Sequence, residues 1–290
     1  MTEHGFAKIN LCMDVLGRRE DGYHDVRTVM QSVAFGDSVT IKRGSGRGVK
    51  FLSDIEYLPS DDRNNAVRAA KLFLNLTNHT DDAELLRFNI SCVKRIPVCG
   101  GLGGSSADAA AVLKLLNRRY GEVFTLEELS EISATLGADV PFCVVGGAAL
   151  AEGIGSELSL LPPLPRCGIV IIKPEFSGIT SDLFAAIDNG KIRAHPDTDG
   201  LVAALIEGDL QGVARRVFNV FESVLTAPQA RLVNDAKGRL LDLGALGSSM
   251  SGSGSAVFGL FGDLRTAKSA YLNLREENIE CYLTIPRNRG

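Results

Sequence analysis

The segment 97–108 is rich in residues with small side chains and in hydroxyl groups, a composition that suits phosphate binding. Four glycines and two serines fall within the eight positions 100–107, and an alanine- and leucine-rich stretch, 109–116, follows directly. Glycines let the backbone approach a ligand, and the first N–H groups of the helix that follows have no partner within that helix. The helix dipole also favours an anion there, so we expect phosphate. Ser105 and Ser106 add hydroxyls for a phosphate oxygen or a magnesium ion.

This segment does not match the two commonest phosphate-loop patterns. G-x-G-x-x-G would need glycine at Ser106, and G-x-x-x-x-G-K-[ST] has no match in the chain. A glycine-rich turn that merely begins a helix is therefore the alternative interpretation. A second small-residue segment, 247–255, has the composition of a linker but lies between predicted elements. Two such loops, one in each half of the chain, suggest a phosphate site at a domain interface.

The β-strand predicted at 6–16 contains polar residues that are candidates for a functional site. Apolar and polar residues alternate there, which predicts a half-buried strand with Lys8 and Asn10 on its polar face. That face either meets solvent, as in most strands, or lines a cleft. Tyr23 and His24 follow at the exit of a charged loop, where a tyrosine either packs or stacks on a nucleobase.

Three further candidate residues lie before and after the glycine-rich segment in the sequence. A strand predicted at 85–96 brings Lys94 and Arg95 to its entrance, and two cations there favour the anion interpretation. Asp139 lies among apolar residues after a helix. A carboxylate in such a place pairs with another group, caps a turn or takes part in catalysis.

The candidate residues described so far lie on or next to both predicted helices and predicted strands. A run of three prolines at 160–165 predicts a stiff connector between domains 1–160 and 161–290. The order of elements indicates an α+β fold in which sheets pack against helices. The other strands are expected at 26–35, 37–42, 49–52, 167–172, 256–261 and 279–285, with a glycine-rich hairpin at 44–48. The helices are expected at 59–74, 125–137 (opening on a capping box), 181–188, 200–207, 209–226, 228–243 and 264–277.

Composition excludes several classes of function. The 290 residues are 45% hydrophobic and 23% charged, with a net charge of −4, which is typical of a globular protein and argues against a general nucleic-acid binder. The six cysteines form no C-x-x-C pair and the four histidines are widely spaced, which argues against a zinc site. We expect reduced thiols, a cytoplasmic location, no export signal and no membrane span.

Several segments together resemble the GHMP kinase superfamily. Segment 97–107 resembles its nucleotide loop, and 251–255 resembles its C-terminal glycine motif. The N-terminal segments 7–11 and 21–24 narrow the resemblance to one branch of the superfamily, and 136–142 fits the same branch. Its members phosphorylate 4-diphosphocytidyl-2-C-methyl-D-erythritol in the non-mevalonate (MEP) pathway of isoprenoid biosynthesis. The resemblance extends over nearly the whole chain.

The nucleotide loop departs from the family pattern in one respect. Many members carry Gly-Gly-Gly-Ser-Ser-Asp, whereas this chain has Gly-Gly-Ser-Ser-Ala-Asp at 103–108. The serine pair is shifted by one place. Which of Ser105 and Ser106 contacts phosphate or metal therefore stays open.

The resemblance implies a fold and a set of ligands. The fold is a two-domain GHMP kinase, with an N-terminal ribosomal-protein-S5-domain-2-like ATP-binding domain (1–160) and a C-terminal ferredoxin-like α/β sandwich (161–290). The ligands are ATP, Mg²⁺ held through the ATP phosphates, and the cytidine substrate. No nucleic acid or membrane partner is expected, and the protein is expected to be a monomer or a weak homodimer.

The resemblance also implies residue roles. Asp139 would orient the substrate hydroxyl and accept its proton, while Lys8 would hold that geometry and offset developing negative charge. Tyr23 and Phe184 would sandwich the cytosine, and His24 would hydrogen-bond to its edge. Substrate contacts are further expected from Asn10, Gly252, Ser253 and Gly254. ATP contacts are expected from Asn64, Lys94, Pro97, Gly100, Gly101, Leu102, Gly103, Gly104, Ser105, Ser106 and Ala107.

Other functions remain as alternatives at this point. One is another small-alcohol kinase of the superfamily, such as a mevalonate or homoserine kinase, which would not need the cytidine-reading residues Tyr23, His24 and Phe184. Another is a non-catalytic relative that binds nucleotide and regulates a partner. The presence of both Lys8 and Asp139 counts against such a regulator. A metal-dependent hydrolase has no supporting ligand cluster in the sequence.

Overall fold

A computed structural model describes residues 1–43, 48–78, 88–190, 192 and 194–289. The chain forms two compact units that are interleaved along the sequence. Unit 1 comprises Met1–Ala7, Phe35–Ile96 and Gly103–Val145, and unit 2 comprises Lys8–Ala34, Pro97–Leu102 and Gly146–Gly290. These units are a different partition from the sequential domains 1–160 and 161–290, whose boundary stays a prediction.

The strands of unit 1 are ordered differently from the expected hairpin. The C-terminal part of β2 (His24–Arg43) pairs antiparallel with β4 (Phe88–Val93), and β3 (Lys50–Ser53) pairs with β4 in parallel. Strand β4 therefore lies between β2 and β3, and the predicted β2–β3 hairpin is wrong. The proposed hairpin tip at 44–47 lies outside the described residues. The parallel pairing places Phe51, which is 2% exposed, in the core.

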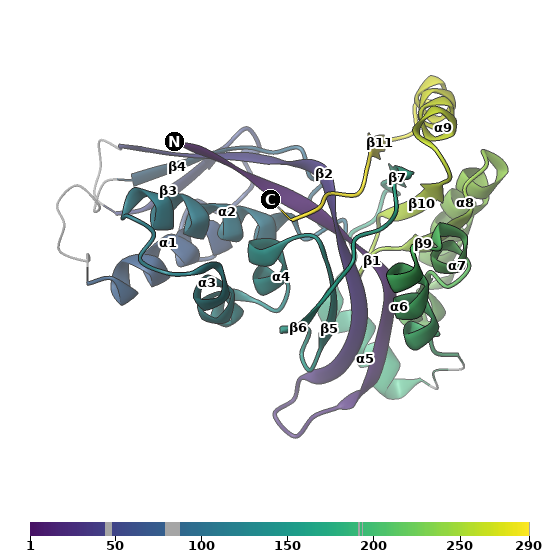
Figure 1. Cartoon of the computed structure of the whole chain (residues 1–290), viewed down its shortest axis with the longest axis horizontal. Coiled ribbons are helices and arrows are strands. Elements are labelled where there is room, and N and C mark those ends of the chain that lie inside the picture. Colours follow the sequence, from purple (N-terminus) through teal and green to yellow (C-terminus); the bar gives the residue numbers. More distant parts are fainter. Residues whose placement is uncertain (44–47, 79–87, 191, 193, 290) are drawn as a thin grey trace. The chain divides into compact units, whose positions relative to one another are not determined.

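Helices α1 (Asn65–Leu76) and α2 (Gly104–Arg119) pack side by side in unit 1 (Figure 1). Two shorter helices, α3 (Leu126–Ser133) and α4 (Val140–Val145), complete the layer. The expected capping box is confirmed, because Thr125 Oγ1 accepts from Glu128 N while Glu128 Oε2 accepts from Thr125 N. A 3₁₀ turn, Ala134–Leu136, continues α3 toward Asp139.

Strand β1 (Thr2–Arg18) passes from unit 1 into unit 2, where its residues 8–15 are buried on both faces. Ile9 is fully buried, but Lys8 and Asn10 are also only 3% and 2% exposed. The expected solvent-facing alternative is therefore wrong, because other parts of unit 2 cover the polar face. The segment at 251–252 lies against this face, where Asn10 N donates to Ser251 Oγ at 3.2 Å. The short strand β8 (Phe218–Asn219) pairs in parallel with β1 at the sheet edge.

Two further strands extend the sheet of unit 2 from β2. Strand β5 (Ala148–Glu152) pairs antiparallel with residues 28–31 of β2, and β6 (Glu157–Leu161) pairs antiparallel with β5. Beyond β6 the chain enters the proline-rich run. Leu164 N in that run donates to the buried Gln31 Oε1 at 2.8 Å, so the run is bound to the sheet.

The second sheet of unit 2 confirms the expected α+β architecture. Its strand order is β11-β7-β10-β9, and each neighbouring pair is antiparallel. Helices α8 (Ala227–Asp242) and α9 (Leu264–Glu276) pack against these strands (Figure 1). The strands are β7 (Gly168–Ile172), β9 (Gly247–Met250), β10 (Val257–Phe261) and β11 (Cys281–Thr284).

Most of the remaining predicted helices are confirmed, but the one expected at 209–226 is wrong. Helices α5 (Thr180–Asn189) and α6 (Thr198–Glu207) form as expected, whereas α7 (Leu210–Ala214) stops early. The chain then forms β8 and a 3₁₀ turn, Val220–Val224, because the amide of Asn219 donates to the carbonyls of Met250 and Gly252 at 2.8 Å. None of the helices in the described parts of the chain is long and apolar enough to cross a membrane.

Candidate active site

The N-terminus of α2 in unit 1 presents backbone N–H groups, as expected for an anion site. Gly103 precedes the helix in the left-handed conformation, with φ of 72°, and no side chain caps this end. The left-handed conformation suits glycine, which has no Cβ to clash. Ser105 in the first turn is exposed and Ser106 is half-buried. The uncapped N–H groups and the helix dipole therefore favour an anion here.

The side chain of Lys94 is buried beside this helix start, between two carboxylates. Its Nζ donates to Asp108 Oδ2 at 2.6 Å and to Asp37 Oδ2, and the three side chains are 4%, 5% and 0% exposed. Asp37 Oδ1 also accepts from the backbone N–H groups of Arg95 and Ile96, at 2.5 and 2.9 Å. The ammonium is thus committed to the protein, and an ATP contact by Lys94 stays a prediction.

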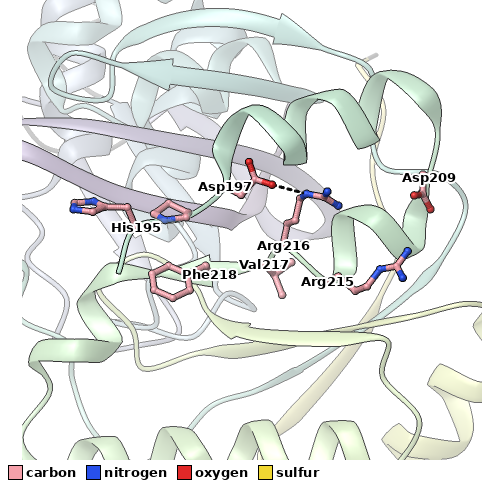
Figure 2. Close-up of a pocket in the computed structure, with 8 residues that line it drawn as sticks. His195, Asp197, Asp209, Arg215, Arg216, Val217 and Phe218 are labelled. Atoms are coloured by element: carbon pink, nitrogen blue, oxygen red, sulfur yellow. Dashed lines mark hydrogen bonds and ion pairs between the residues drawn. The ribbon is translucent and has the colours of Figure 1, made fainter. Parts of the chain in front are cut away.

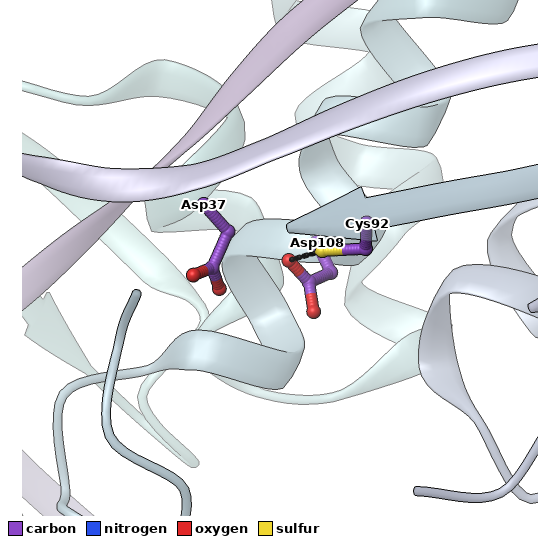
Figure 3. Close-up of side chains that lie close together, drawn as sticks. All are labelled: Asp37, Cys92 and Asp108. Carbon is purple, nitrogen blue, oxygen red and sulfur yellow. Dashed lines mark hydrogen bonds between the residues drawn. The ribbon is translucent and has the colours of Figure 1, made fainter. Parts of the chain in front are cut away.

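Burial and mutual charge set the protonation of this cluster. Burial raises the pKa of Asp108 to about 7, although the neighbouring Lys94 partly offsets this effect. Burial lowers the pKa of Lys94, but the charges of Asp108 and Asp37 outweigh it and raise this pKa to about 12. Figure 3 shows Asp37, Asp108 and Cys92 close together, as potential metal ligands. The Lys94 ammonium already supplies the positive charge between the two carboxylates.

Lys8 and Asn10 come together in unit 2, as expected. Lys8 Nζ donates to Asn10 Oδ1 at 2.6 Å, and Lys8 N donates to the carbonyl of Leu102 at 3.0 Å. Both side chains come from the same face of β1, because residues two apart in a strand point the same way. The backbone bond joins that strand to the segment 97–102, which contains the first half of the glycine-rich loop.

The two glycine-rich segments of unit 2 also meet beside Lys8. Ser251 Oγ donates to the carbonyl of Gly101 at 3.0 Å. A Cβ on Gly101 would lie 2.0 Å from the carbonyl oxygen of Ser251, so only glycine allows this approach. Gly252, with φ of 52°, lies so close that a Cβ there would be 3.2 Å from Lys8 Nζ. The segments 97–102 and 251–254 therefore form one surface next to the lysine.

The cytidine-reading candidates lie at the start of β2 and on α5, within unit 2. The rings of His24 and Phe184 stack, with centroids 4.4 Å apart and planes inclined by 15°. His24 Nε2 lies 2.8 Å from Asp188 Oδ1, and Phe184 meets Phe221 edge-on at 5.1 Å. Tyr23 is 62% exposed. His24 and Phe184 are therefore brought together, while a cytosine sandwich by Tyr23 and Phe184 stays a prediction.

Asn64 and Asp139 belong to unit 1. Asn64 is the N-cap of α1: its Oδ1 accepts from Ala66 N and its Nδ2 donates to the carbonyl of Pro59, both at 2.9 Å. Asp139 is half-buried immediately before α4, and its carbonyl accepts from Cys143 N at 3.1 Å. Asp139 lies in unit 1 and Lys8 lies in unit 2, so a joint catalytic role of the two residues stays a prediction.

An open pocket of about 660 Å³ in unit 2 contains none of the predicted site residues (Figure 2). Two of its lining side chains lie against carboxylates. Arg216 Nε donates to Asp197 Oδ2 at 2.8 Å, and His195 Nδ1 lies 2.8 Å from Asp14 Oδ1. The lining residues are His195, Pro196, Asp197, Asp209, Arg215, Arg216, Val217 and Phe218.

Three polar residues at the site had no role in the sequence interpretation. Thr28 bonds to Asn10, Asp37 bonds to Lys94, and Asp188 bonds to His24. Thr28 lies within a predicted strand, Asp37 begins one and Asp188 ends a predicted helix, so the local pattern gives no signal of these contacts. Their partners are 18, 57 and 164 positions away, so the pairing itself could not be predicted locally.

Comparison with known proteins identifies the class. Residues 64–147 match the GHMP kinases N terminal domain, and residues 201–280 match the GHMP kinases C terminal domain. A homoserine kinase from Cytophaga hutchinsonii, at 21% identity, shares the fold with a TM-score of 0.70 over 98% of this chain and 95% of that chain. The chain thus has the N-terminal and C-terminal domains and the fold of a GHMP kinase.

More similar relatives define the branch. The 4-diphosphocytidyl-2-C-methyl-D-erythritol kinase of Clostridium botulinum (strain Kyoto / Type A2) is 40% identical over 98% of this chain and 99% of its own length. That of Acetivibrio thermocellus is 41% identical over 96% of both chains. A crystal structure of 4-(cytidine 5'-diphospho)-2C-methyl-D-erythritol kinase, 30% identical, superposes with a TM-score of 0.79 over the whole of both chains. The chain belongs to the 4-diphosphocytidyl-2-C-methyl-D-erythritol kinase family.

Proposed function

We propose that this protein transfers the γ-phosphoryl group of ATP to the 2-hydroxyl of 4-diphosphocytidyl-2-C-methyl-D-erythritol and releases ADP, as a step of the MEP pathway of isoprenoid biosynthesis. The observation that carries this proposal is the sequence identity of about 40% to relatives named 4-diphosphocytidyl-2-C-methyl-D-erythritol kinase, over almost their full length. The position of Lys8 and Asn10 against the glycine-rich segments of unit 2 supports it.

The chain's own residues divide the chemical work. Phosphoryl transfer requires mainly positioning and charge stabilisation, with little covalent chemistry by the protein. Asp139 orients the substrate hydroxyl and accepts its proton, and Lys8 offsets the negative charge that develops. His24, Phe184 and Tyr23 bind the cytosine. The buried setting of Lys8, at 3% exposure, strengthens its electrostatic effect because screening by water is weak there.

ATP binds at the uncapped N-terminus of α2, whose backbone N–H groups hold the phosphates. Mg²⁺ prefers oxygen ligands and usually bridges substrate phosphates, which makes the serine hydroxyls of this loop suitable additional ligands. When bound, the ion neutralises charge on the phosphates. The buried Asp37–Lys94–Asp108 cluster is less suitable, because the ammonium occupies both carboxylates.

A coupled ADP-release assay with ATP, Mg²⁺ and the cytidine substrate tests the function, with mevalonate and homoserine in parallel wells. We expect turnover with the cytidine substrate alone. Turnover only with another alcohol would replace the substrate assignment. Nucleotide binding without turnover in any well would favour a regulator. The cytoplasmic location and the monomeric or weakly dimeric state stay predictions.

Asp139→Asn should lower turnover by at least about a hundredfold, the usual contribution of a positioned base, and leave ATP affinity unchanged. Lys8→Met should likewise lower kcat rather than raise KM. Steady-state kinetics and ATP-binding calorimetry measure both effects. Near-normal turnover of the Asp139→Asn protein would remove this carboxylate from the mechanism.

A further inference from the structure

Thr28 forms a hydrogen-bonded chain with the residues that hold Lys8. It lies on β2, is 3% exposed and belongs to unit 2 together with Lys8 and Asn10. Its Oγ1 donates to the carbonyl of Cys12 at 2.6 Å and accepts from Asn10 Nδ2 at 2.8 Å. The other end of the Asn10 amide, Oδ1, accepts from Lys8 Nζ at 2.6 Å.

The chemistry of these groups fixes the direction of every bond in the chain. A carbonyl oxygen only accepts, so the single hydroxyl proton of Thr28 points to Cys12. Toward Asn10 the hydroxyl can then only accept, which requires the NH₂ group of the amide on that side. The ammonium of Lys8 only donates, which requires the amide oxygen on the opposite side. Both ends therefore demand the same orientation of the Asn10 amide.

The reversed amide would lose both bonds. Its NH₂ group would face the ammonium of Lys8, and its oxygen would face a hydroxyl whose proton is already engaged by Cys12. Without the Thr28 hydroxyl, one of these two restraints disappears and a buried N–H donor of Asn10 loses its acceptor. Buried donors without acceptors are unfavourable, so the amide would rotate or shift, and Lys8 would move with it.

We propose that Thr28 is a positioning residue: its hydroxyl sets the orientation of the Asn10 amide, which in turn holds the ammonium of Lys8 in place for phosphoryl transfer. This inference rests on the proposed function for its effect on catalysis. Its structural part, the orientation of Asn10, stands on the hydrogen-bond geometry alone.

The strand itself does not depend on this hydroxyl. Residues 28–31 of β2 pair with β5 through their backbones. Valine has the same branched shape as threonine and suits a strand equally well, so Thr28→Val removes the hydroxyl while keeping the packing. Thr28→Ser retains the hydroxyl and loses only a methyl group. Thr284→Val is a matched control, because Thr284 is also a buried strand threonine, with a weak 3.5 Å contact to the Ile285 carbonyl.

The kinetic test compares these three variants with the wild-type protein. Thr28→Val should lower kcat roughly ten- to a hundredfold, the scale of a small misplacement of a catalytic group, while KM for ATP changes less than about twofold. Thr28→Ser should recover most of this loss, and Thr284→Val should behave as wild type. A normal kcat for Thr28→Val, or an equal loss in Thr28→Ser, would overturn the proposal.

A spectroscopic test separates this inference from the proposed function. With ¹⁵N-asparagine labelling, the side-chain NH₂ signals of Asn10 should lose their protection from hydrogen exchange in Thr28→Val and keep it in Thr28→Ser. Unchanged protection in Thr28→Val would overturn the proposal, even if the wild-type protein phosphorylates no alcohol tested. If Thr28→Val does not fold, Thr28→Cys, whose thiol is a weak acceptor, takes its place.

Discussion

A single carboxylate controls how His24 presents its ring. Asp188 Oδ1 can only accept, so the neighbouring Nε2 of His24 donates to it at 2.8 Å. In the neutral imidazole, Nδ1 is then an acceptor, which suits the amino group of a cytosine. The ring of Phe184 stacks on one face of the His24 ring and so fixes its plane. Under the proposed function, the base preference would therefore depend on Asp188, which does not itself contact the base.

Asp188→Asn should weaken this control, because an amide can either donate to or accept from Nε2. We expect KM for the cytidine substrate to rise roughly tenfold, which corresponds to about 1.4 kcal/mol, with kcat and KM for ATP nearly unchanged. Asp182→Asn is the control, since Asp182 is exposed on the same helix. An unchanged substrate KM in the Asp188 variant would show that the carboxylate has no part in binding.

At the scale of elements, the Asp37–Lys94–Asp108 cluster ties together three parts of unit 1. Asp37 lies on β2, Lys94 follows β4, and Asp108 lies in the first turns of α2. Removing one member of such a buried group leaves an uncompensated charge and typically costs about 3–5 kcal/mol. The cluster therefore holds the start of α2 against the sheet of unit 1.

The raised pKa of Asp108 predicts a pH dependence of stability. Its pKa is about 7 in the folded protein and lower in the unfolded chain, so the folded state binds the extra proton. This contribution to stability is complete below about pH 4 and disappears as the pH rises through 7. Between pH 5 and pH 8 the wild-type protein should lose about 1–3 kcal/mol from this group.

Asp108→Asn should remove that part of the pH dependence, because asparagine cannot titrate. Chemical denaturation at pH 5 and pH 8 measures the free energy of unfolding of both proteins. The difference between the two pH values should be smaller in the variant than in the wild type. Equal differences would mean that Asp108 does not titrate in this range, and exposed Asp182→Asn should match the wild type.

The sequence patterns predicted individual helices and strands better than the pairing between them. The capping box at Thr125 and the alternation around Lys8 depend on near neighbours, and both elements formed as predicted. The β3 pairing and the end of α7 depend on distant groups: β4 in one case, and the bonds from Asn219 to the 250–252 backbone in the other. No local pattern contains that information. The same limit applies to the site, where Lys8 and His24 were identified but Thr28 and Asp188 were not.

At the scale of the whole molecule, the core of unit 2 is assembled from both ends of the chain. Met13, Val15 and Val26 from the N-terminal segment share one hydrophobic cluster with residues such as Val170 and Phe261. The GHMP kinase resemblance predicted the two-domain α+β fold correctly. The interleaving of the compact units could not be read from the order of elements.

This assembly predicts that residues 161–290 will not fold alone. The fragment lacks the N-terminal strand segments that cover its core and pair with β8. We expect weak near-ultraviolet circular dichroism and no cooperative thermal transition, because burial of apolar surface is the main stabilising contribution. Adding residues 1–160 in trans should restore both signals. A cooperative transition of the isolated fragment would contradict this expectation.

The interleaving also has a consequence for biosynthesis. Segment Lys8–Ala34 leaves the ribosome early, but the rest of unit 2, apart from a six-residue segment, begins only at Gly146. At typical rates of translation, about 110 residues correspond to roughly 6–20 seconds. For that time the apolar side chains that these strands contribute to the core of unit 2 lack their later partners from residues 146–290. Such strands are expected to bind a chaperone that receives nascent chains, and slower translation should lengthen that association.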